Sequence, residues 1–434
     1  VRTMQEEDLT NIKENENDEL EISKEPERGH WESRWEFLFS CIGLSVGIGN
    51  VWRFPYLAFE NGGGAFLLPY LVILFLIGKP IYLLEVAIGQ YSQVGPSKIW
   101  KLAPISKGIG IATFLANILV TLYFNVIISY TLFYLFASWS KVLPWSGCYE
   151  SWGADNKTCF VRSQNKKQLP LCSNLGVDVK NYTVGVNCTN TKLQTASEQY
   201  WERNVLNIRQ GGLTHFGDVG SLKWELCLCN FLAWIIIFLC MIKGIKSIGK
   251  VVHFTGTFPF FVLILIVFNG LLNHGSMDGI KFFFIPKWNK LLTFKVWHAA
   301  AEQMFYSLSI SWGSLIVFGS YNKFNHRVHI DAYIVCILDL ITSLLAGCAI
   351  FSVLGNWSAK LNLPIDQVVK SGRGLAFVVY PEALTGLPNP HFSASLFFFM
   401  LFTLGLDSQV SLCYRFVQIW EVFQSRSLLH LKLF

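Results

Sequence analysis

The sequence predicts an all-α protein that crosses a membrane several times. Apolar residues make up 52% of the 434 residues and charged residues only 15%, which is too apolar for an ordinary soluble domain. Several segments of about 20 residues carry few or no charges, and that length crosses the hydrocarbon core of a bilayer. The six excess positive charges therefore give no indication of nucleic-acid binding.

Eight segments are long and apolar enough to be predicted spans. In chain order they are residues 35–58, 65–89, 109–138, 224–242, 251–272, 297–321, 331–355 and 393–415. The segment before them, 1–30, is polar and acidic and lacks the apolar core of a signal peptide. We expect it to be a disordered cytosolic tail.

Positive charges in the loops predict how the spans are oriented. They lie before span 1 and between spans 2 and 3, 4 and 5, and 6 and 7: Arg28, Arg34, Lys98, Lys101, Lys107, Lys243, Lys246, Lys250, Lys323 and Arg327. Because such loops remain on the cytosolic side, we expect a multi-pass plasma-membrane protein with a cytosolic N-terminus.

The long segment 140–222 is then expected to be extracellular. It contains three N-glycosylation sequons, at Asn156, Asn181 and Asn187. It also contains four cysteines in a compartment that permits disulfides: Cys148, Cys159, Cys172 and Cys188. We favour the pair Cys148–Cys159, although the connectivity of four cysteines cannot be deduced from sequence.

Spans 1 and 6 contain residues that weaken a helix at membrane depth. Three glycines precede an amide in span 1: Gly43, Gly47, Gly49 and Asn50. Small residues occupy the centre of span 6: Ser307, Ser309, Ser311 and Gly313. Unwound backbone at this depth must line a cavity, and two such breaks predict a secondary transporter with substrate at the midplane. The alternative is that the glycines only permit close helix packing.

Two carboxylates lie at membrane depth, Asp339 in span 7 and Asp407 in span 8. Each is costly in lipid and must face a partner or water. Because hard cations prefer oxygen ligands, we interpret Asp407 with Ser408, and Asp339 with Asn50 and Ser307, as cation sites. A proton relay or a structural hydrogen-bonding role is the alternative for each aspartate.

A third carboxylate, Glu85, lies at the end of span 2. We expect it to hold a broken helix by accepting hydrogen bonds from backbone N–H groups.

Five blocks of sequence, in order, resemble the sodium- and chloride-dependent neurotransmitter symporter family. They are GNVWRFPY at 49–56, NGGGAF at 61–66 with PY at 69–70, SYNKF at 320–324, GLAF at 374–377 with YPEA at 380–383, and LGLDS at 404–408. The resemblance runs from residue 28 to about residue 410.

The resemblance implies an inverted-repeat (5+5) transporter fold, in which helices 1–5 are mirrored by helices 6–10 and helices 1 and 6 are discontinuous. About eight of the usual twelve helices would be present. The expected divisions are a tail at 1–30, a first repeat at 31–272 that includes the loop 140–222, an incomplete second repeat at 273–415 and an atypical end at 416–434.

The resemblance also implies ligand sets for ions and substrate. One sodium ion would bind Ser45, Asn50, Ser307 and Asp339, and the second would bind Gly43, Val46, Leu404, Asp407 and Ser408. A chloride ion would bind Tyr70, Gln303, Ser307 and Ser343 beside Asp339. Substrate would contact Ser45, Gly47, Gly49, Phe124, Tyr306, Ser309, Ser311, Trp312 and Ser408. The gate residues would be Arg53 outside, and Arg28 with Trp31 inside.

Two positions indicate the substrate class. Gly47 stands where monoamine members carry an aspartate that pairs with the amine, so a zwitterion fits better. Its carboxylate could take the amides near Ile48 and Gly49, because the positive end of a half-helix favours anions. Trp312 resembles glycine-selective members and should reduce the pocket. Asp339 and the stretches Gly355-Asn356 and 368–372 instead resemble arthropod nutrient amino-acid transporters.

Three departures from the family pattern affect the details. Phe124 replaces a tyrosine whose hydroxyl would bind the substrate carboxylate. Asp339 replaces an asparagine shared by a sodium and the chloride site, and its fixed charge is expected to weaken chloride dependence. Residues 412–434 do not resemble helix 8, and the acidic partner of Arg53 in helix 10 is expected to be missing. An incomplete gene model or a truncated splice form would explain this end.

We therefore expect a sodium-coupled symporter of a small neutral amino acid such as glycine, working by alternating access across the plasma membrane. The alternative is a truncated, non-transporting form that associates with complete transporter subunits. The expected partners are the amino acid, membrane lipid and, in the alternative, those subunits. No nucleophile–base pair, phosphate loop or metal-binding Cys/His spacing indicates an enzyme.

Overall fold

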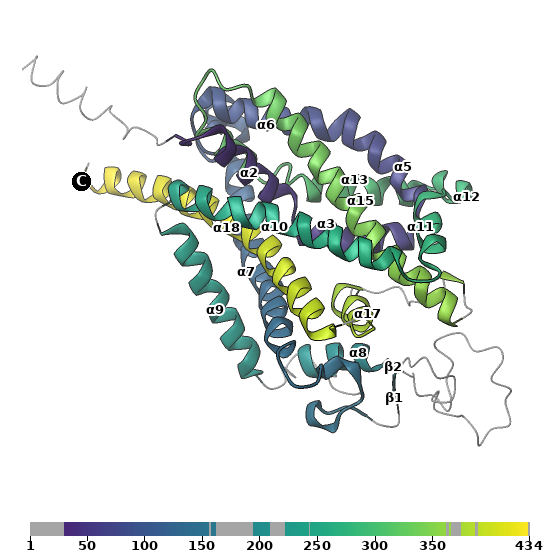
Figure 1. The fold of residues 1–434 in the computed structure, drawn as a ribbon. Helices are drawn as coiled ribbons and strands as arrows, with labels where there is room; N and C mark the ends of the chain where they lie inside the picture. The colour runs from purple at the N-terminus through teal and green to yellow at the C-terminus, as the bar shows by residue number, and fades with distance from the viewer. Residues whose placement is uncertain are drawn as a thin grey trace, which may run out of the picture.

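The computed structural model describes residues 30–155, 158–161, 194–208, 222–242, 244–361, 364–365, 375–386 and 389–432. Long helices run across the molecule, and shorter elements in the loops connect them at either end (Figure 1). The only sheet among the described residues pairs two short parallel strands, β1 (Cys159–Phe160) and β2 (Gln194–Thr195).

All eight predicted spans are helical. Five are continuous helices or helices in series: α5 (Gly64–Ile73), η1 (Leu74–Gly78) and α6 (Lys79–Ser92); α7 (Lys107–Ala137); α9 (Trp224–Met241); α10 (Ile245–Leu271); and α15 (Val328–Leu361). The first and sixth spans are interrupted as predicted. They comprise α2 (Arg34–Ser45), α3 (Ile48–Val51) and α4 (Arg53–Glu60), and α13 (Phe294–Ser307) and α14 (Ser314–Gly319).

Length and composition separate the sixth span from the others. Within the described ranges, six helices are long and apolar enough to cross a membrane by themselves, and span 1, bent by 46°, makes seven. Helices α13 and α14 have only 14 and 6 residues. The sixth span therefore reaches across the molecule only as two pieces.

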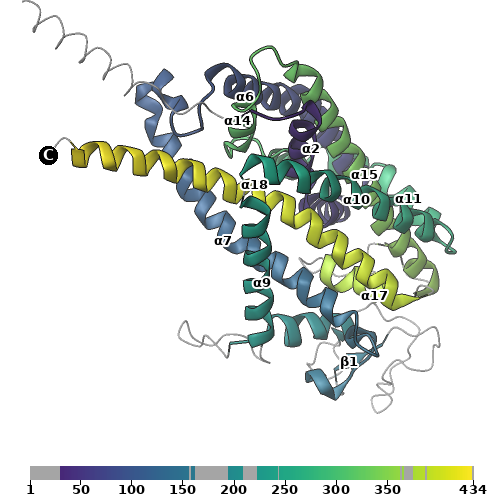
Figure 2. The ribbon, with the colours of Figure 1, turned by 60° about the vertical axis from the view of Figure 1, so that its left-hand side comes forward.

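The eighth predicted span, 393–415, agrees with an apolar helical span at Pro390–Tyr414. Helix α18 itself runs on from Pro390 to Lys432, beyond the end of this span. The physical reason is visible in the sequence, because residues 415–432 contain neither the glycine nor the proline that would end a helix. Figures 1 and 2 show this helix lying along α7 and extending beyond it.

The loop elements lie at the two ends of the spans. They are η2 (Ile99–Leu102), η3 (Pro104–Ser106), η4 (Pro144–Ser146), η5 (Glu150–Trp152), α8 (Ala196–Gln199), η7 (Tyr200–Val205), α11 (Ser276–Phe284), α12 (Trp288–Leu291), η8 (Leu375–Val379) and α17 (Tyr380–Leu384). The loops predicted to be cytosolic and the loop predicted to be extracellular lie at opposite ends (Figure 1).

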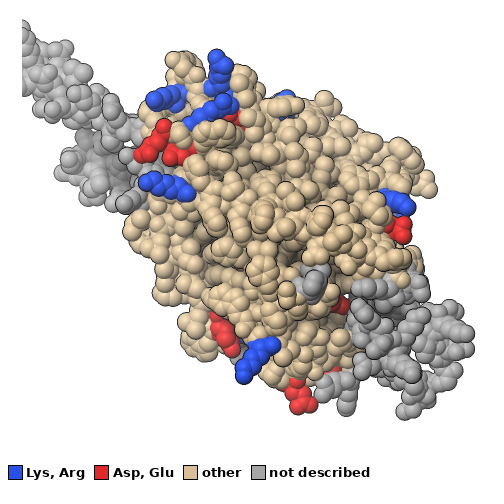
Figure 3. Space-filling view, in the orientation of Figure 1, with Lys and Arg blue, Asp and Glu red and all other residues tan. Residues whose placement is uncertain are grey.

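The outer surface of the helices is apolar. Side chains on α7, α9 and α10 are about two-thirds exposed in the isolated chain, as in Leu119, Phe231 and Phe268. On the face drawn in Figure 3, charged residues gather toward the upper left and the lower right, with an uncharged region between them. A surface of this kind is stable against lipid rather than water.

Small residues allow the helices around span 1 to approach closely. A Cβ added to Gly405 on α18 would lie 2.8 Å from Cδ1 of Ile48, and one added to Gly43 on α2 would lie 2.7 Å from Oδ2 of Asp407. Larger residues would push α18 away from the interrupted helix.

Candidate substrate and ion site

The break in span 1 exposes backbone next to a buried amide. Helix α2 ends at Ser45 and α3 begins at Ile48, and Oδ1 of Asn50 accepts a hydrogen bond from the Gly47 N–H at 3.0 Å. A Cβ on Gly47 would lie 2.8 Å from Oγ of Ser408, and one on Gly49 would lie 2.8 Å from Cε1 of Tyr306. Glycines at these positions keep the space beside the break open.

The break in span 6 has left-handed backbone at two serines. Ser309 has φ of 53° and Ser311 has φ of 70°, a region that residues other than glycine seldom adopt. The Ser311 N–H donates to Oε1 of Glu85 at 2.7 Å, and the Ser309 hydroxyl donates to the Leu44 carbonyl at 3.3 Å. The predicted role of Glu85 is therefore confirmed.

A cavity of about 60 Å³ lies between the two breaks. Eight of the nine residues predicted to contact substrate line it, namely Ser45, Gly47, Gly49, Phe124, Tyr306, Ser309, Trp312 and Ser408. The ninth, Ser311, does not line the cavity, and its amide is bonded to Glu85 instead.

The first ion cluster forms around Asp339, which is fully buried. Its Oδ1 accepts from Nδ2 of Asn50 and from the Ser307 hydroxyl, both at 2.7 Å, and its Oδ2 accepts from the Tyr70 hydroxyl at 3.1 Å. Nδ2 of Asn50 is also 2.9 Å from the Ser343 hydroxyl. Residues predicted for one sodium site and for the chloride site thus form one hydrogen-bonded group.

Gln303 belongs to the predicted chloride set but takes no part in these hydrogen bonds. Its side chain is fully buried on α13, and neither end of its amide has a hydrogen-bond partner among the described residues. A buried amide without partners is costly, so this position is suited to an additional polar ligand.

The second ion cluster forms around Asp407, which is 4% exposed. Gly43 packs against its carboxylate, and the Ser408 hydroxyl lies 3.5 Å from the Gly43 carbonyl and 3.4 Å from the Leu404 carbonyl. Val46 follows directly after the end of α2. The Asp407 carboxylate also accepts a hydrogen bond from the Thr255 hydroxyl on α10.

Neither aspartate resembles a transition-metal centre. Within the residues that the structure describes, no group of three or more His, Cys, Asp and Glu side chains could hold a metal ion. Hydroxyl groups contact both carboxylates, and two backbone carbonyls lie near Ser408 beside Asp407; oxygens of these kinds are ligands for hard cations.

The outer gate residue Arg53 has a partner that the sequence analysis did not identify. Its Nη2 lies 2.5 Å from Oε1 of Glu302, and its guanidinium lies over the Tyr306 ring at 4.8 Å from the centroid. Glu302 and Tyr306 are one turn apart on α13. Among the described residues Arg53 thus has an acidic partner on α13, which is not the helix-10 residue that the family pattern would supply.

At the opposite end, Trp31 packs against the end of α14. Its indole N–H donates to the Phe318 carbonyl at 3.1 Å, and its backbone N–H donates to the Tyr321 carbonyl at 3.2 Å. Arg28, the other predicted gate residue, lies outside the described residues.

A second polar contact at this end was also not predicted. The buried carboxylate of Asp331 lies 2.6 Å from Nη2 of Arg34 and 2.6 Å from Nε2 of His326. It connects the start of α15 to the start of α2.

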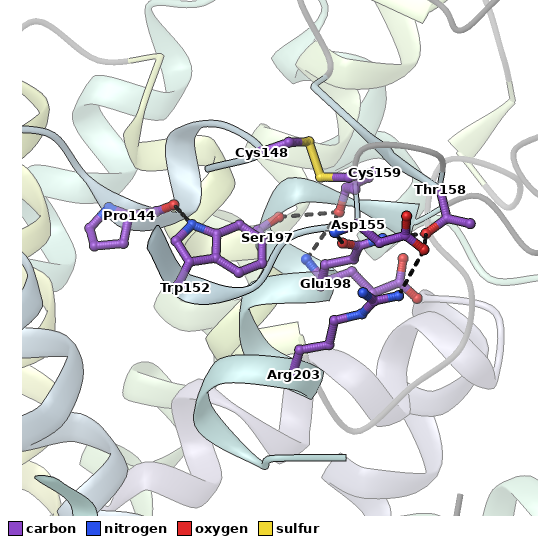
Figure 4. Close-up of a disulfide and its surroundings, with 11 residues drawn as sticks. Pro144, Cys148, Trp152, Asp155, Thr158, Cys159, Ser197, Glu198 and Arg203 are labelled. Atoms are coloured by element: carbon purple, nitrogen blue, oxygen red, sulfur yellow. Dashed lines mark hydrogen bonds and ion pairs between the residues drawn. A yellow bond between two sulfur atoms is a disulfide. The ribbon is translucent and has the colours of Figure 1, made fainter. Parts of the chain in front are cut away.

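The described part of the loop 140–222 is folded around a disulfide. Cys148 and Cys159 are bonded, and Asp155 nearby pairs with Arg203 at 3.4 Å (Figure 4). The remaining loop cysteines Cys172 and Cys188 and the sequon residues Asn156, Asn181 and Asn187 lie outside the described residues.

This loop also packs on the segment before α18. The Ser197 hydroxyl donates to the carboxylate of Glu382 at 2.9 Å, and the Trp201 ring stacks on Phe377 at 4.7 Å. Burial lowers the pKa of Lys223, whose ammonium donates to the carbonyl of Asn204. The first two contacts join the loop to α17 and η8.

Comparison with known proteins identifies the family. The model of the sodium:neurotransmitter symporter family matches residues 28–427, which extends past the last of the quoted motifs. Glycine transporter 2 of Xenopus laevis, named as sodium- and chloride-dependent, is 46% identical over 88% of this chain and 49% of its own length.

Two further relatives are amino-acid transporters by name. The human sodium- and chloride-dependent neutral and basic amino acid transporter B(0+) is 44% identical over 90% of this chain and 62% of its own length. The sodium-dependent nutrient amino acid transporter 1 of Drosophila virilis is 43% identical over 90% of this chain and 60% of its own length. The chain thus spans about half to three-fifths of the length of these relatives.

The fold agrees with this assignment. The crystal structure of MhsT in complex with L-phenylalanine matches with a TM-score of 0.67 and 28% identity, over 89% of this chain and 73% of that one. The named relatives are solute transporters and not enzymes. With its interrupted first and sixth spans in an inverted-repeat arrangement, the chain belongs to the sodium:neurotransmitter symporter family.

Proposed function

We propose that this chain contains the substrate and sodium sites of a symporter that carries a small neutral amino acid, such as glycine, across the plasma membrane. The observation that carries the proposal is the cavity between two interrupted helices, with a buried aspartate cluster at Asp339 and another at Asp407. A cavity with convergent polar groups at membrane depth is suited to a polar solute.

The two aspartate clusters support a coupling of solute to cations. Each places a carboxylate beside hydroxyl or carbonyl oxygens in a water-poor environment, where an uncompensated negative charge is costly. In our proposal sodium ions are co-substrates that supply this compensation at the residue sets named above. Solute and sodium then bind together, because each ion stabilises the backbone that the solute contacts.

The cavity lining supports a small zwitterion. Gly47 and Gly49 leave room only for compact groups, since an added Cβ at either would approach a neighbouring side chain within 2.8 Å. Trp312 and Phe124 supply bulk on the other walls. None of the described residues that line the cavity has an anionic side chain to pair with a substrate that carries only an amine.

The Asp339 cluster supports transport that depends weakly on chloride. Tyr70 and Ser307, from the chloride set, already donate hydrogen bonds to the Asp339 carboxylate. A fixed anion at that place supplies negative charge that a bound chloride would otherwise bring. The unpartnered amide of Gln303 leaves one donor for a free anion.

The membrane orientation is part of the same proposal. The N-terminus and the loops rich in lysine and arginine lie on the cytosolic side, and the loop with the Cys148–Cys159 disulfide is extracellular. Glycosylation of Asn156, Asn181 or Asn187 would test the orientation, because only a loop that enters the secretory lumen is modified.

Uptake is the direct test. The protein is expressed in cells from its complete coding sequence, and labelled glycine, alanine and proline uptake is measured in sodium and in choline medium. We expect uptake of at least one of these amino acids in sodium medium and none above background in choline. Equal uptake in the two media, with the protein at the cell surface, would refute the proposal.

A further inference from the structure

Span 2 contains a cation that the proposed transport site does not use. Lys79 and Glu85 are the two charged residues in the predicted span 65–89, and Glu85 accepts the Ser311 amide. Lys79 begins α6, directly after the π-helical turn η1. A lysine within a membrane span requires an anion, water or an aromatic ring nearby.

An aromatic ring on α15 lies beside this lysine. Nζ of Lys79 is 4.3 Å from the centroid of the Tyr333 ring. Lys79 takes part in none of the ion pairs found among the described residues. Asp339 is six residues further along α15, about 9 Å in helix rise, and its oxygens accept hydrogen bonds from other groups.

Two hydrogen bonds from span 2, one to α15 and one to the loop just before α15, indicate the depth of Lys79. On one side of it Tyr70 bonds to Asp339, and on the other side Nε2 of Gln90 bonds to the His326 carbonyl at 3.0 Å. Tyr333 is five residues after the start of α15, about 8 Å of rise. Lys79 therefore lies on the cytosolic side of the ion cluster, between that cluster and the loop expected to be cytosolic.

The surroundings of the pair face the bilayer. Tyr333 is 49% exposed, and Leu76 and Leu84 on span 2 are 72% and 56% exposed. In a bilayer these surfaces contact lipid. The ammonium is thus at the edge of a lipid-facing surface, with an aromatic ring on one side, and no anion within the described ranges forms an ion pair with it.

We propose that Lys79 and Tyr333 bind the phosphate group of an anionic phospholipid from the cytosolic leaflet. The ammonium supplies the opposite charge, and the Tyr333 hydroxyl is a donor on the same lipid-facing surface. Anionic lipids are concentrated in that leaflet, and basic residues near its surface attract them. A lysine stem can also bend toward the headgroups while it contacts acyl chains.

The position also connects lipid binding to span 6. Gly78, the last residue of η1, packs on span 6, because an added Cβ would lie 2.6 Å from Sδ of Met304 on α13. A lipid held at Lys79 would stabilise the turn that supports α13. We expect phosphatidylglycerol to increase thermal stability more than phosphatidylcholine does.

The test measures lipid retention directly. The protein, purified from its complete coding sequence, is titrated with phosphatidylglycerol or phosphatidylcholine, and bound lipid is counted by native mass spectrometry. We expect Lys79→Met to weaken phosphatidylglycerol retention about fivefold and to remove most of its effect on Tm. Lys79→Arg should retain both, and Lys101→Met, at an exposed loop lysine, serves as the matched control.

Two outcomes would overturn the proposal. One is that Lys79→Met retains phosphatidylglycerol as well as the unchanged protein does. The other is that Asp339→Asn restores the Tm lost in Lys79→Met without any anionic lipid, because the charge of Lys79 would then be balanced within the protein. If Lys79→Met does not fold, Tyr333→Leu keeps the lysine and should still lower phosphatidylglycerol retention, and unchanged retention would contradict the proposal.

Discussion

The two buried aspartates differ in how the protein satisfies them. Asp339 accepts hydrogen bonds from Asn50, Ser307 and Tyr70, which come from α3, α13 and α5. Asp407 accepts one side-chain hydrogen bond among the described residues, from Thr255 on α10. The first carboxylate is stabilised by three neutral donors without any ion, and in our proposal the second depends more on a bound cation because it has fewer donors.

The largest effect should come from Asp407. Replacement by alanine, Asp407→Ala, removes the only charge in the second cluster, and we expect sodium-dependent amino-acid uptake to fall to background. Asp278→Ala is the control, because Asp278 is 71% exposed on α11. Substantial uptake by Asp407→Ala at normal surface abundance would mean that the second cluster is structural.

Asp339→Asn should change the ion requirement rather than abolish uptake. The amide keeps most of the hydrogen-bonding geometry but removes the fixed charge. We expect replacement of chloride by gluconate to reduce uptake by the variant about fivefold or more and to leave the unchanged protein nearly unaffected. If uptake by the unchanged protein collapses in gluconate, the charge of Asp339 does not take over the role of chloride.

Thr255→Val tests whether the Thr255 hydroxyl, which donates to the Asp407 carboxylate, holds that carboxylate in position. Removal of an outer hydrogen bond to a metal ligand typically weakens affinity about tenfold or more, so the sodium concentration for half-maximal uptake should rise by that factor. Thr257→Val, an exposed position two residues away, should leave it unchanged. Equal sodium dependence in both variants would exclude a positioning role.

The smallest effect should come from the ion pair above the cavity. Arg53 and Glu302 are 29% and 54% exposed, and exposed pairs contribute about 1 kcal/mol or less. We expect Glu302→Gln to change the apparent substrate affinity by no more than about fivefold. A complete loss of uptake would show that Glu302 acts within the transport mechanism and not only at its entrance.

The sequence predicted the parts that depend on local pattern. Long apolar segments identified every span, and the glycine and serine runs identified both breaks. The predicted ligands Asn50 and Asp339 are far apart in the sequence, and their pairing was predicted from polar chemistry at membrane depth and from the resemblance to the family; in the structure they are hydrogen-bonded at 2.7 Å.

Contacts between helices were harder to predict. Nothing in the sequence indicated that Glu302 pairs with Arg53 or that Thr255 bonds to Asp407. Which side chains meet between two helices depends on how each helix is rotated about its axis. Ser311 was expected in the cavity, but its left-handed backbone turns its amide toward Glu85. Hydropathy located the end of the eighth span near Tyr414 but not the end of α18, because hydropathy falls there while helix propensity does not.

The sodium dependence of labelled glycine binding tests the central claim most directly. It is measured on protein purified from the complete coding sequence, with sodium varied at constant ionic strength. If both clusters hold sodium beside the substrate, binding should rise more steeply than first order in sodium, and Asp407→Ala should make it shallower and weaker. Glycine binding that is the same without sodium would contradict the account, and so would an unchanged steepness in Asp407→Ala.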